Sequence, residues 1–392
     1  MKTIVGINTV NYGSTGKLML GLAEQARRSG YEYRTFCQDG HAQIKGIPGN
    51  AFIGSWVEKR ISDAINTMTG YQGALNHFGT NAFLKKLDHI HPDLIHLHNL
   101  HSNFVNLDAL FAYIKKNNIP VVWTLHDCWA FTGHCPHFIT AGCTRWQTGC
   151  HDCPLYREYP AAIKDRSREM YARKKEMFTG IENMELAVPS KWMQSFLPDS
   201  FLKEYPSQVI YNGIDLNLFQ PREGSFCRDH HLEDKFIILA VAFPWTEQKG
   251  LDRMLALADR LDDSWQIVLV GIDHVENEKI LCIPRTADQK QLTEIYTAAD
   301  VLINPSRVES FGLVNVEALA CGTPVISYGA GGNIETFDDS CGRLVNDDNL
   351  VEVLHDMKEK QMPAQACIEY ARRFDLQHMY EQYLRLYEKM LK

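Results

Sequence analysis

The fold of this chain is decided by one stretch, Ile303-Asn304-Pro305-Ser306-Arg307-Val308-Glu309-Ser310-Phe311-Gly312-Leu313-Val314-Asn315-Val316-Glu317-Ala318-Leu319-Ala320-Cys321-Gly322-Thr323-Pro324-Val325-Ile326. An apolar run that ends at Pro305 predicts a strand, and the polar residues 306–312 carry the chemistry of a turn. A helix is predicted from Leu313 to Ala320, and it stops at Gly322, where a residue with positive φ is usually required. A second apolar run follows, so the order is strand, loop, helix and strand.

This order of elements predicts a phosphate site. Backbone N–H groups at a helix start bind phosphate, and here they are reached through Ser310, Phe311 and Gly312. Gly312 would let a ligand come close. Carboxylates beside a phosphate would repel it, so we interpret Glu309 and Glu317 as acceptors for hydroxyl groups on either side of it. A ligand with hydroxyls, a diphosphate and further hydroxyls is a nucleotide sugar.

With its flanking residues, the stretch resembles the E-x7-E signature of the family 4 retaining glycosyltransferases, enzymes of the two-domain GT-B fold. The resemblance implies that Glu309 contacts hydroxyls of the donor sugar and that Glu317 holds the ribose. It also implies that the amides of Phe311, Gly312 and Leu313 take the distal phosphate. It extends over the chain from Thr3 to the last helix, so we expect an α/β protein of two Rossmann-like doubly wound domains facing a central cleft.

Size and composition agree with two folded domains. A chain of 392 residues exceeds the size at which one core keeps growing. Hydrophobic residues at 45% and charged residues at 22% are ordinary for a globular protein, and a net charge of -8 argues against nucleic acid as a partner. No apolar run approaches the roughly 20 residues of a membrane span. We therefore expect a cytoplasmic protein, which could also associate as a peripheral protein with the inner face of the membrane.

Alternating strand and helix patterns fill both predicted domains. We assign the first domain to residues 1–215, on the acceptor side, and the donor domain to 216–372. Residues 373–392 form a terminal helix, and the resemblance implies that it crosses back to the first domain, whereas an ordinary amphipathic surface helix is the alternative. The predicted strands cover 3–8, 33–37, 94–98, 121–125, 186–188, 209–211, 236–241 and 266–270, the predicted helices cover 16–29, 107–116 and 251–261, and residues 40–79 are left unassigned.

Lys249 is the predicted cation for the diphosphate, because it stands just before a helix and next to Gly250. The family commonly has an arginine a few residues earlier, but Ala, Phe, Pro and Trp occupy 242–245 here. Arg307 or Arg285 could supply the missing charge. The resemblance also places Asn212, in Asn-Gly-Ile-Asp, at the interdomain cleft among the donor-binding residues.

A glycine-rich loop near the amino end, with Gly13, Ser14, Thr15 and Gly16, invites comparison with a Walker A phosphate loop. Asn11 replaces its first glycine and Leu18 its final Ser or Thr, which argues against a nucleoside triphosphatase. The resemblance instead implies that this loop lines the acceptor side.

Histidines follow two predicted strands of the first domain. His126 ends a strand at its carboxyl edge, where open α/β sheets place ligands, and the family has a histidine there. We expect it to contact the donor sugar or the acceptor, with a purely structural histidine as the alternative. His96, His98 and His101 end another strand, so one or more of them could face the acceptor, and a metal held by a pair of them is a weaker alternative.

Five of the eleven cysteines lie within residues 128–154. In a reducing compartment, Cys135, Cys143, Cys150 and Cys153 offer four soft ligands for a structural zinc that would fold this loop. The alternative is a set of reduced core cysteines, and Cys128 and His134 could replace one of the ligands.

The sequence therefore predicts a retaining, metal-independent hexosyltransferase that moves a sugar from a UDP- or GDP-linked donor to a hydroxyl acceptor. Glu309, Lys249 and His126 are its predicted catalytic residues. The resemblance implies a glycan or polyprenyl-linked oligosaccharide acceptor in bacterial surface polysaccharide synthesis. The alternatives are a nucleotide-sugar epimerase or a phosphorylase of the same architecture, and a binding protein that has lost transfer.

Overall fold

The computed structural model of the chain describes residues 1–40, 42–286 and 288–392. The chain folds into two compact units. Unit 1 comprises Met1–Ile210 together with Tyr380–Lys392, and unit 2 comprises Tyr211–Met379. Each unit is an α/β domain built on its own parallel sheet, which confirms the expectation of two Rossmann-like domains.

Unit 1 contains a seven-stranded sheet in the order β3-β2-β1-β4-β5-β6-β7, with every pair parallel. The chain steps outward from β1 in one direction and then returns to β4 and continues in the other, so the carboxyl ends of β1 and β4 flank the switch point. The strands are β1 (Thr3–Ile7), β2 (Glu32–Gln38), β3 (Asn50–Ile53), β4 (Leu94–Leu97), β5 (Val121–Thr124), β6 (Met184–Val188) and β7 (Ser207–Val209).

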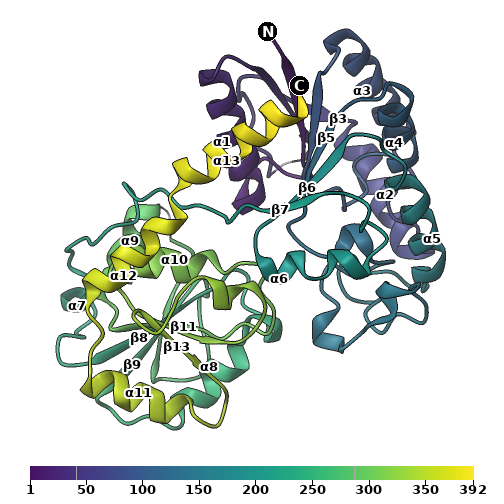
Figure 1. The fold of residues 1–392 in the computed structure, drawn as a ribbon. Coiled ribbons are helices and arrows are strands. Elements are labelled where there is room, and N and C mark those ends of the chain that lie inside the picture. The colour runs from purple at the N-terminus through teal and green to yellow at the C-terminus, as the bar shows by residue number, and fades with distance from the viewer. Residues whose placement is uncertain (41, 287) are drawn as a thin grey trace. The chain divides into compact units, whose positions relative to one another are not determined.

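Helices cover both faces of the first sheet. In Figure 1, α1 and α13 lie together on one face, and α3, α4 and α5 lie on the other. This is the consequence of right-handed crossovers that run in opposite directions from the switch point. The helices with residues in unit 1 are α1 (Gly13–Arg28), α2 (Trp56–Thr69), α3 (His77–Ile90), α4 (Leu107–Lys116), α5 (Ser167–Phe178), α6 (Lys191–Gln194) and α13 (Leu376–Met390).

Unit 2 contains a six-stranded parallel sheet in the order β10-β9-β8-β11-β12-β13. Its switch point lies between β8 and β11. The strands are β8 (Phe236–Val241), β9 (Trp265–Val270), β10 (Ile280–Ile283), β11 (Val301–Asn304), β12 (Val325–Tyr328) and β13 (Gly342–Val345). The helices are α7 (Phe226–Asp229), α8 (Leu251–Ala258), α9 (Gln289–Ala298), α10 (Leu313–Ala320), α11 (Leu350–Glu359) and α12 (Ala364–Ala371).

The deciding stretch folds as its sequence predicts. Helix α10 spans Leu313–Ala320, and Gly322 has a φ of 89°. Three helices differ from the prediction, and one of them is the terminal helix α13, which spans Leu376–Met390 and not 373–392. Helix α1 begins at Gly13, three residues earlier than expected, because Gly13 tolerates a φ of 66° at the first helical position. Helix α8 ends at Ala258 and not at Leu261. Residues 40–79, which the sequence left unassigned, include β3, α2 and the start of α3.

The part of α13 that belongs to unit 1 is anchored by buried hydroxyl groups. Tyr387 Oη lies 2.7 Å from His96 Nδ1, and Tyr383 Oη lies 3.0 Å from Thr124 Oγ1. His96 Nε2 lies 2.8 Å from the same Thr124 hydroxyl. His96 is therefore a structural residue that joins β4, β5 and α13. Burial lowers the pKa of this histidine to about 3, so the ring is neutral.

None of the helices in the described ranges has the length and the apolar character that crossing a bilayer requires.

Candidate functional site

Three loops of unit 2 meet at the carboxyl ends of β8, β11 and β12. The amide of Glu309 donates to the carbonyl of Ala330 at 2.8 Å, and the amide of Gly332 donates to the carbonyl of Glu309 at 2.8 Å. On the other side, the amide of Arg307 donates to the carbonyl of Gln248 at 2.9 Å. The loop before α10 is thus held by backbone hydrogen bonds to both neighbouring loops.

Glu309 and Lys249 form an ion pair at this edge of the sheet. Lys249 Nζ lies 2.6 Å from Glu309 Oε1, and Ser306 Oγ donates to the same oxygen at 2.9 Å. A short 3₁₀ helix, η5 (Glu247–Lys249), presents the lysine. The Glu309 side chain is 17% exposed and that of Lys249 is 35% exposed. The structure therefore brings together a predicted sugar-binding carboxylate and a predicted phosphate-binding cation at the surface of unit 2.

The start of α10 has the geometry that a close ligand requires. Gly312, at its N-terminal boundary, has a φ of 91°, and a Cβ added to it would lie 3.0 Å from Cβ of Asn333. A side chain here would be strained and crowded, so glycine is needed. Phe311 is buried among Tyr211 and Phe374, with ring centroids 5.8 and 5.5 Å away. Its side chain packs in the core, so only its backbone is placed to contact a ligand.

Glu317 lies on α10, one helical turn or more beyond these amides. Its Oε2 accepts a hydrogen bond of 2.8 Å from the hydroxyl of Tyr296. Burial and the nearby carboxylate hold the pKa of Tyr296 well above its ordinary value, so the phenol stays protonated and donates. The tyrosine fixes one oxygen of Glu317, and this arrangement suits a carboxylate that accepts hydrogen bonds from hydroxyl groups.

The other residues predicted to bind the donor, or to supply its missing cation, have partners other than Glu309 and Lys249. The guanidinium of Arg307 makes a bidentate ion pair with Asp252, at 2.7 and 2.8 Å, and also donates to the carbonyl of Glu247. Arg285 lies over the ring of Phe243, 4.8 Å from its centroid. Arg307 thus joins the loops after β8 and β11, and its role toward a donor stays a prediction. Asn212 follows β7 at a half-buried position, and its role is likewise a prediction.

A buried chain of amide side chains supports the loop, and the sequence did not identify it. Asn304 Nδ2 donates to Asn315 Oδ1 at 2.9 Å, and Asn315 Nδ2 donates to Thr336 Oγ1 at 2.9 Å. Asn333 Nδ2 donates to Ser327 Oγ at 2.8 Å. These side chains join β11, α10 and the segment after β12. The signal in the sequence was the presence of asparagines within apolar segments, where an amide must find a partner.

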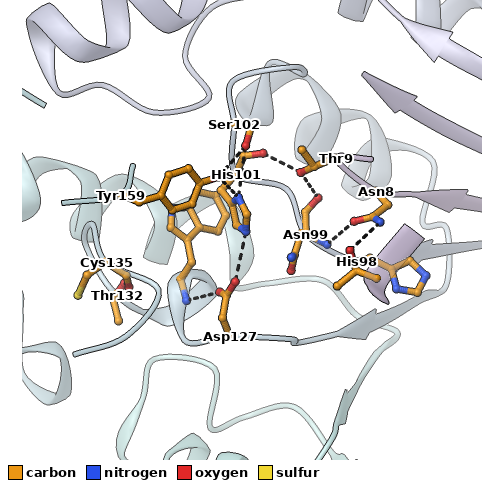
Figure 2. A network of polar contacts seen from close by, with 12 residues as sticks. Asn8, Thr9, His98, Asn99, His101, Ser102, Asp127, Thr132, Cys135 and Tyr159 are labelled. Carbon is orange, nitrogen blue, oxygen red and sulfur yellow. Dashed lines mark hydrogen bonds and ion pairs between the residues drawn. The ribbon is translucent and has the colours of Figure 1, made fainter. Parts of the chain in front are cut away.

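In unit 1, the turn after β1 is tied to the loop after β4. The amide of Asn99 donates to Asn8 Oδ1 at 3.2 Å, and Thr9 Oγ1 lies 2.8 Å from the carbonyl oxygens of both Asn99 and His101, so that its one proton can go to either (Figure 2). Asn8 Nδ2 also lies 3.2 Å from Thr15 Oγ1. The residues predicted for the acceptor side, Gly13, Ser14, Thr15 and Gly16, lie in the first turn of α1 and not in a loop, which corrects the prediction.

Two neutral histidines lie at the carboxyl ends of β4 and β5. His98 Nδ1 and His126 Nε2 share a hydrogen bond of 3.1 Å, and the rings are stacked with centroids 5.4 Å apart. Burial lowers the pKa of His126 to about 4 and that of His98 well below its ordinary value. Near neutral pH both rings are uncharged, so His98 can hold His126 in place by a hydrogen bond, and neither ring offers a ligand a positive charge.

Asp127, His101 and Tyr159 form a second hydrogen-bonded series in unit 1 (Figure 2). Asp127 Oδ2 lies 3.2 Å from His101 Nε2, and His101 Nδ1 lies 2.8 Å from the hydroxyl of Tyr159. Burial would raise the pKa of Asp127, but hydrogen bonds from His101 and from the amide of Trp129 lower it to about 2. The ionised carboxylate therefore keeps the proton on Nε2, and Nδ1 can accept the phenol proton. The sequence named His101 but not its two partners.

Comparison with known families identifies the family of this chain. The family described as Glycosyltransferase Family 4 matches residues 15–218, and the family described as Glycosyl transferases group 1 matches residues 227–374. The first match alone covers more than half of the chain. The chain belongs to glycosyltransferase family 4. The expectation that the sequence raised through the signature of Glu309 and Glu317 is thereby confirmed.

Two bacterial proteins are similar to this family 4 protein over more than three quarters of its length. It is 26% identical to a protein described as a colanic acid biosynthesis glycosyl transferase, WcaC of Escherichia coli K12, over 76% of this chain and 77% of the relative. It is also 26% identical to an uncharacterized 41.2 kDa protein in the cps region of Klebsiella pneumoniae, over 78% of this chain and 81% of that one.

Solved structures resemble the family 4 protein over its full length. Sucrose-phosphate synthase from Thermosynechococcus elongatus gives a TM-score of 0.72 at 17% identity, and covers 100% of this chain and 99% of its own. Anabaena HepE in complex with UDP and glucose gives 0.69 at 15% identity, with 99% and 100% covered. These likenesses establish the GT-B fold.

The cysteine-rich loop of this family 4 protein gathers its thiols around one small cavity. The cavity is lined by residues that include all four predicted zinc ligands, Cys135, Cys143, Cys150 and Cys153. A hydrogen bond between the thiols of Cys135 and Cys153 raises the pKa of the first and lowers that of the second. However, the described residues contain no group of three or more His, Cys, Asp or Glu arranged to hold a metal ion. The structure does not support the predicted zinc, which stays a prediction from the sequence.

Aromatic packing and a buried lysine hold the same loop. Phe138 lies 4.8 Å from Trp146 and 5.1 Å from Phe196, centroid to centroid. Lys174 is buried, donates to the carbonyls of Trp129 and Thr132 at 2.8 and 3.1 Å, and lies 3.5 Å from the Trp129 ring centroid. The zinc prediction assumed a loop too polar to fold by itself, and it overlooked these apolar contacts.

Proposed function

We propose that this protein is a retaining glycosyltransferase that moves a hexose from a UDP- or GDP-linked donor to a hydroxyl of a glycan or lipid-linked oligosaccharide. The observation that carries the proposal is the Glu309–Lys249 ion pair of 2.6 Å at the start of α10. It combines a carboxylate for sugar hydroxyls, a cation for phosphate and helix amides in one small region of unit 2.

The bond that breaks joins the anomeric carbon of the sugar to the distal phosphate oxygen. Departure of the nucleoside diphosphate leaves negative charge on that phosphate, and Lys249 with the amides at Phe311, Gly312 and Leu313 stabilises it where it develops. The acceptor oxygen forms the new bond to the same carbon, and its proton passes to the leaving diphosphate. In this front-face course no protein side chain forms a covalent bond with the sugar.

Glu309 is proposed to orient the sugar of the bound donor. Because it already pairs with Lys249 and Ser306, hydroxyl groups of the sugar must join or replace these contacts. A carboxylate accepts several hydrogen bonds at once, so it can keep the lysine while it orients the sugar. The pair then ties the position of the sugar to the position of the departing phosphate.

The acceptor is proposed to lie at the histidines of unit 1. His126 offers a neutral ring that its hydrogen bond to the buried His98 holds in place, and Tyr159 offers a hydroxyl whose direction is set by His101. Such groups suit an uncharged polyol, because they donate and accept hydrogen bonds without a fixed charge. The first turn of α1 adds backbone amides that suit an acceptor carrying phosphate.

The proposed role in surface polysaccharide synthesis is supported by the description of the relative WcaC and by the cps region of the second relative. The proposed uridine nucleotide is supported by the structural likeness to HepE, which was solved with UDP and glucose. Donor sugar, linkage and acceptor are therefore the quantities to measure first.

A donor screen tests the proposal. Purified protein is incubated with UDP- and GDP-sugars, alone and with lipid-linked oligosaccharide acceptors, and both the nucleoside diphosphate and the glycosylated product are measured. We expect diphosphate release that depends on one donor, rises with acceptor and is lost in Glu309→Gln. Product with the anomeric configuration of the donor confirms retention, and inversion contradicts it.

The same screen separates the alternatives. A binding protein would bind the nucleotide with no release, and an epimerase would convert the sugar while the nucleotide stays attached. A phosphorylase would instead need phosphate to cleave a glycan. Each of these results would overturn the proposed transfer.

A further inference from the structure

A cavity of about 510 Å³ lies in unit 1 at the amino ends of β6 and β7. Its lining comes from three segments, which are the turn after α5 with the start of β6, the residues just before β7, and the last turn of α13. We call it the β6 cavity. His98 and His126 follow the carboxyl ends of β4 and β5, at the other edge of the same parallel sheet. The β6 cavity is therefore separate from the proposed acceptor site, and its volume is that of a site for a small molecule.

Glu185 contributes a buried carboxylate to the lining of the β6 cavity. It lies on β6, between β5 and β7, and its side chain is 5% exposed. Its Oε2 accepts a hydrogen bond of 2.5 Å from Nζ of Lys389, whereas Oε1 has no hydrogen-bond partner in the part of the chain that the structure describes. A buried carboxylate oxygen without a donor is costly in free energy. Because Glu185 lines the cavity, a ligand bound there would supply the missing donor.

Apolar side chains form another part of the lining. Ile181, Met184 and Met390 are buried residues that line the cavity. Tyr205 also lines it, and its hydroxyl accepts from the amide of Ile181 at 3.1 Å and donates to the carbonyl of Phe178 at 2.9 Å. These two hydrogen bonds join the segment before β7 to the turn after α5. The cavity therefore has a fixed shape, with apolar surface beside the buried carboxylate.

The charged residues of the lining select a cation as the ligand. They are Glu182, Glu185, Glu204 and Lys389, so negative charge is in excess. Glu182 and Glu204 are exposed and Glu185 is buried, so carboxylates are available at two depths. A matching ligand has ammonium groups for these carboxylates and methylene groups for the apolar surface between them. A linear polyamine has this structure.

We propose that the β6 cavity binds a linear polyamine, an alkyl chain that carries two or more ammonium groups. One ammonium group donates to Glu185 Oε1, while Lys389 keeps its contact with Oε2. The methylene chain contacts the apolar lining, and a second ammonium group pairs with Glu204. This inference goes beyond the proposed sugar transfer and does not rest on it, because the binding needs no donor or acceptor.

Helix α13 joins the β6 cavity to the histidines of the sheet. Lys389 lies in the last turn of α13, beside Tyr387 in the sequence, and the hydroxyl of Tyr387 lies 2.7 Å from His96 Nδ1. The rings of His96 and His98 are 4.0 Å apart, centroid to centroid. A polyamine bound at Glu185 would therefore hold the end of the helix that also anchors His96. Because such a ligand binds the folded chain, it should raise the melting temperature.

Calorimetric titration of the full chain tests the inference, with spermidine and putrescine as the probes. We expect saturable binding at a single site, weaker at high salt, and a melting temperature that rises with the polyamine concentration. Glu185→Gln should lower the affinity roughly tenfold to a hundredfold, because an amide offers no charge to the buried ammonium group. Glu204→Gln, at an exposed position, should lower it roughly twofold to fivefold.

A matched control removes an exposed carboxylate of α13 that does not line the cavity. Glu381 is such a residue, and Glu381→Gln should bind polyamine as the wild type does. Butanediol, which has the methylene chain of putrescine without its charges, should not bind. Because no nucleotide is present in these titrations, their outcome is independent of the proposed sugar transfer.

Three results would overturn the inference. They are a wild type that binds no polyamine, variants at Glu185 and Glu204 that bind as tightly as the wild type, and displacement of spermidine by Mg²⁺ at the same concentration of charge. The last result would show attraction to the net charge alone. Thermal melting reports whether each variant is folded, and if Glu185→Gln does not fold, the affinity of Glu204→Gln decides.

Discussion

The Glu309 region of unit 2 and the histidine region of unit 1 differ in the charge and the exposure of their polar groups. In unit 2, a carboxylate and an ammonium group are paired at the surface, at 2.6 Å, and both remain partly exposed. In unit 1, burial keeps His98 and His126 neutral, and the ionised Asp127 is enclosed by hydrogen bonds. The comparison teaches that the proposed donor region presents paired charges, whereas the proposed acceptor region presents directed hydrogen bonds.

The largest expected effect is on the charged side of this comparison. Glu309→Gln keeps the size of the side chain but removes the charge that pairs with Lys249. We expect kcat to fall roughly 10³-fold, because the sugar loses its orienting acceptor and the lysine its partner. Steady-state kinetics with the identified donor measure it. Glu352→Gln, at an exposed position on α11, is the matched control and should transfer normally. Normal transfer by Glu309→Gln would remove the carboxylate from the mechanism.

The next effect concerns the cysteine-rich loop, which follows the histidine region in unit 1. Phe138→Ala removes a buried ring of the cysteine-rich loop and should lower the free energy of unfolding by about 3–5 kcal/mol. Cys143→Ser, at a half-buried position, should cost about 1 kcal/mol or less if no metal is bound. Chemical denaturation measures both, and elemental analysis of the purified protein is the direct test of zinc. One zinc ion per chain, together with a melting temperature that falls when a chelator is added, would confirm the prediction made from the sequence.

Asp127 should make a smaller, pH-dependent contribution to the free energy of unfolding. Its pKa is about 2 in the folded protein, below the ordinary 3.8, so the carboxylate adds stability above its unfolded pKa. This corresponds to about 2 kcal/mol at neutral pH, which is lost as the pH falls through the window from about 4 to 2. Asp127→Asn should therefore be less stable than the wild type at pH 7, and denaturation at a series of pH values should show the difference shrink on acidification.

A separate readout distinguishes a positioning role of Asp127 from a purely structural one. If it orients Tyr159 through His101, Asp127→Asn and Tyr159→Phe should raise the KM for the acceptor by similar factors and leave the KM for the donor unchanged. A KM for the acceptor that stays at the wild-type value in both variants would contradict the acceptor assignment.

The smallest expected effect lies at the start of α10. Gly312→Ala puts a Cβ at a φ of 91° and 3.0 Å from Cβ of Asn333, which should cost about 1–2 kcal/mol. Because the strain lies where the diphosphate is proposed to bind, the Kd for nucleoside diphosphate should rise together with the loss of stability. Calorimetric titration measures the first and thermal melting the second. At Gly329, an added Cβ has no neighbour within 4 Å, so Gly329→Ala is the control.

Local patterns were enough to predict much of the fold. Leu313–Ala320 was predicted as a helix with the bounds that the structure has, because a polar turn and Gly322 delimit it. The unassigned residues 40–79 show what such patterns leave open. Helix α2 has apolar residues at spacings of three and four, which is a helical pattern that could have predicted it, but the pattern does not say that the apolar side faces outward and that Ser62 and Asn66 face inward.

The sequence by itself determined the family, the two α/β domains and the pairing of Glu309 with a nearby helix start, since these depend on neighbours in the chain. Only the tertiary structure decided which charges meet. Lys249 and Glu309 are sixty residues apart, as are Arg307 and Glu247, and adjacent parallel strands bring their loops together. The tertiary structure also made His98 and His126 neutral, because their pKa values depend on burial, and burial is a property of the packed molecule.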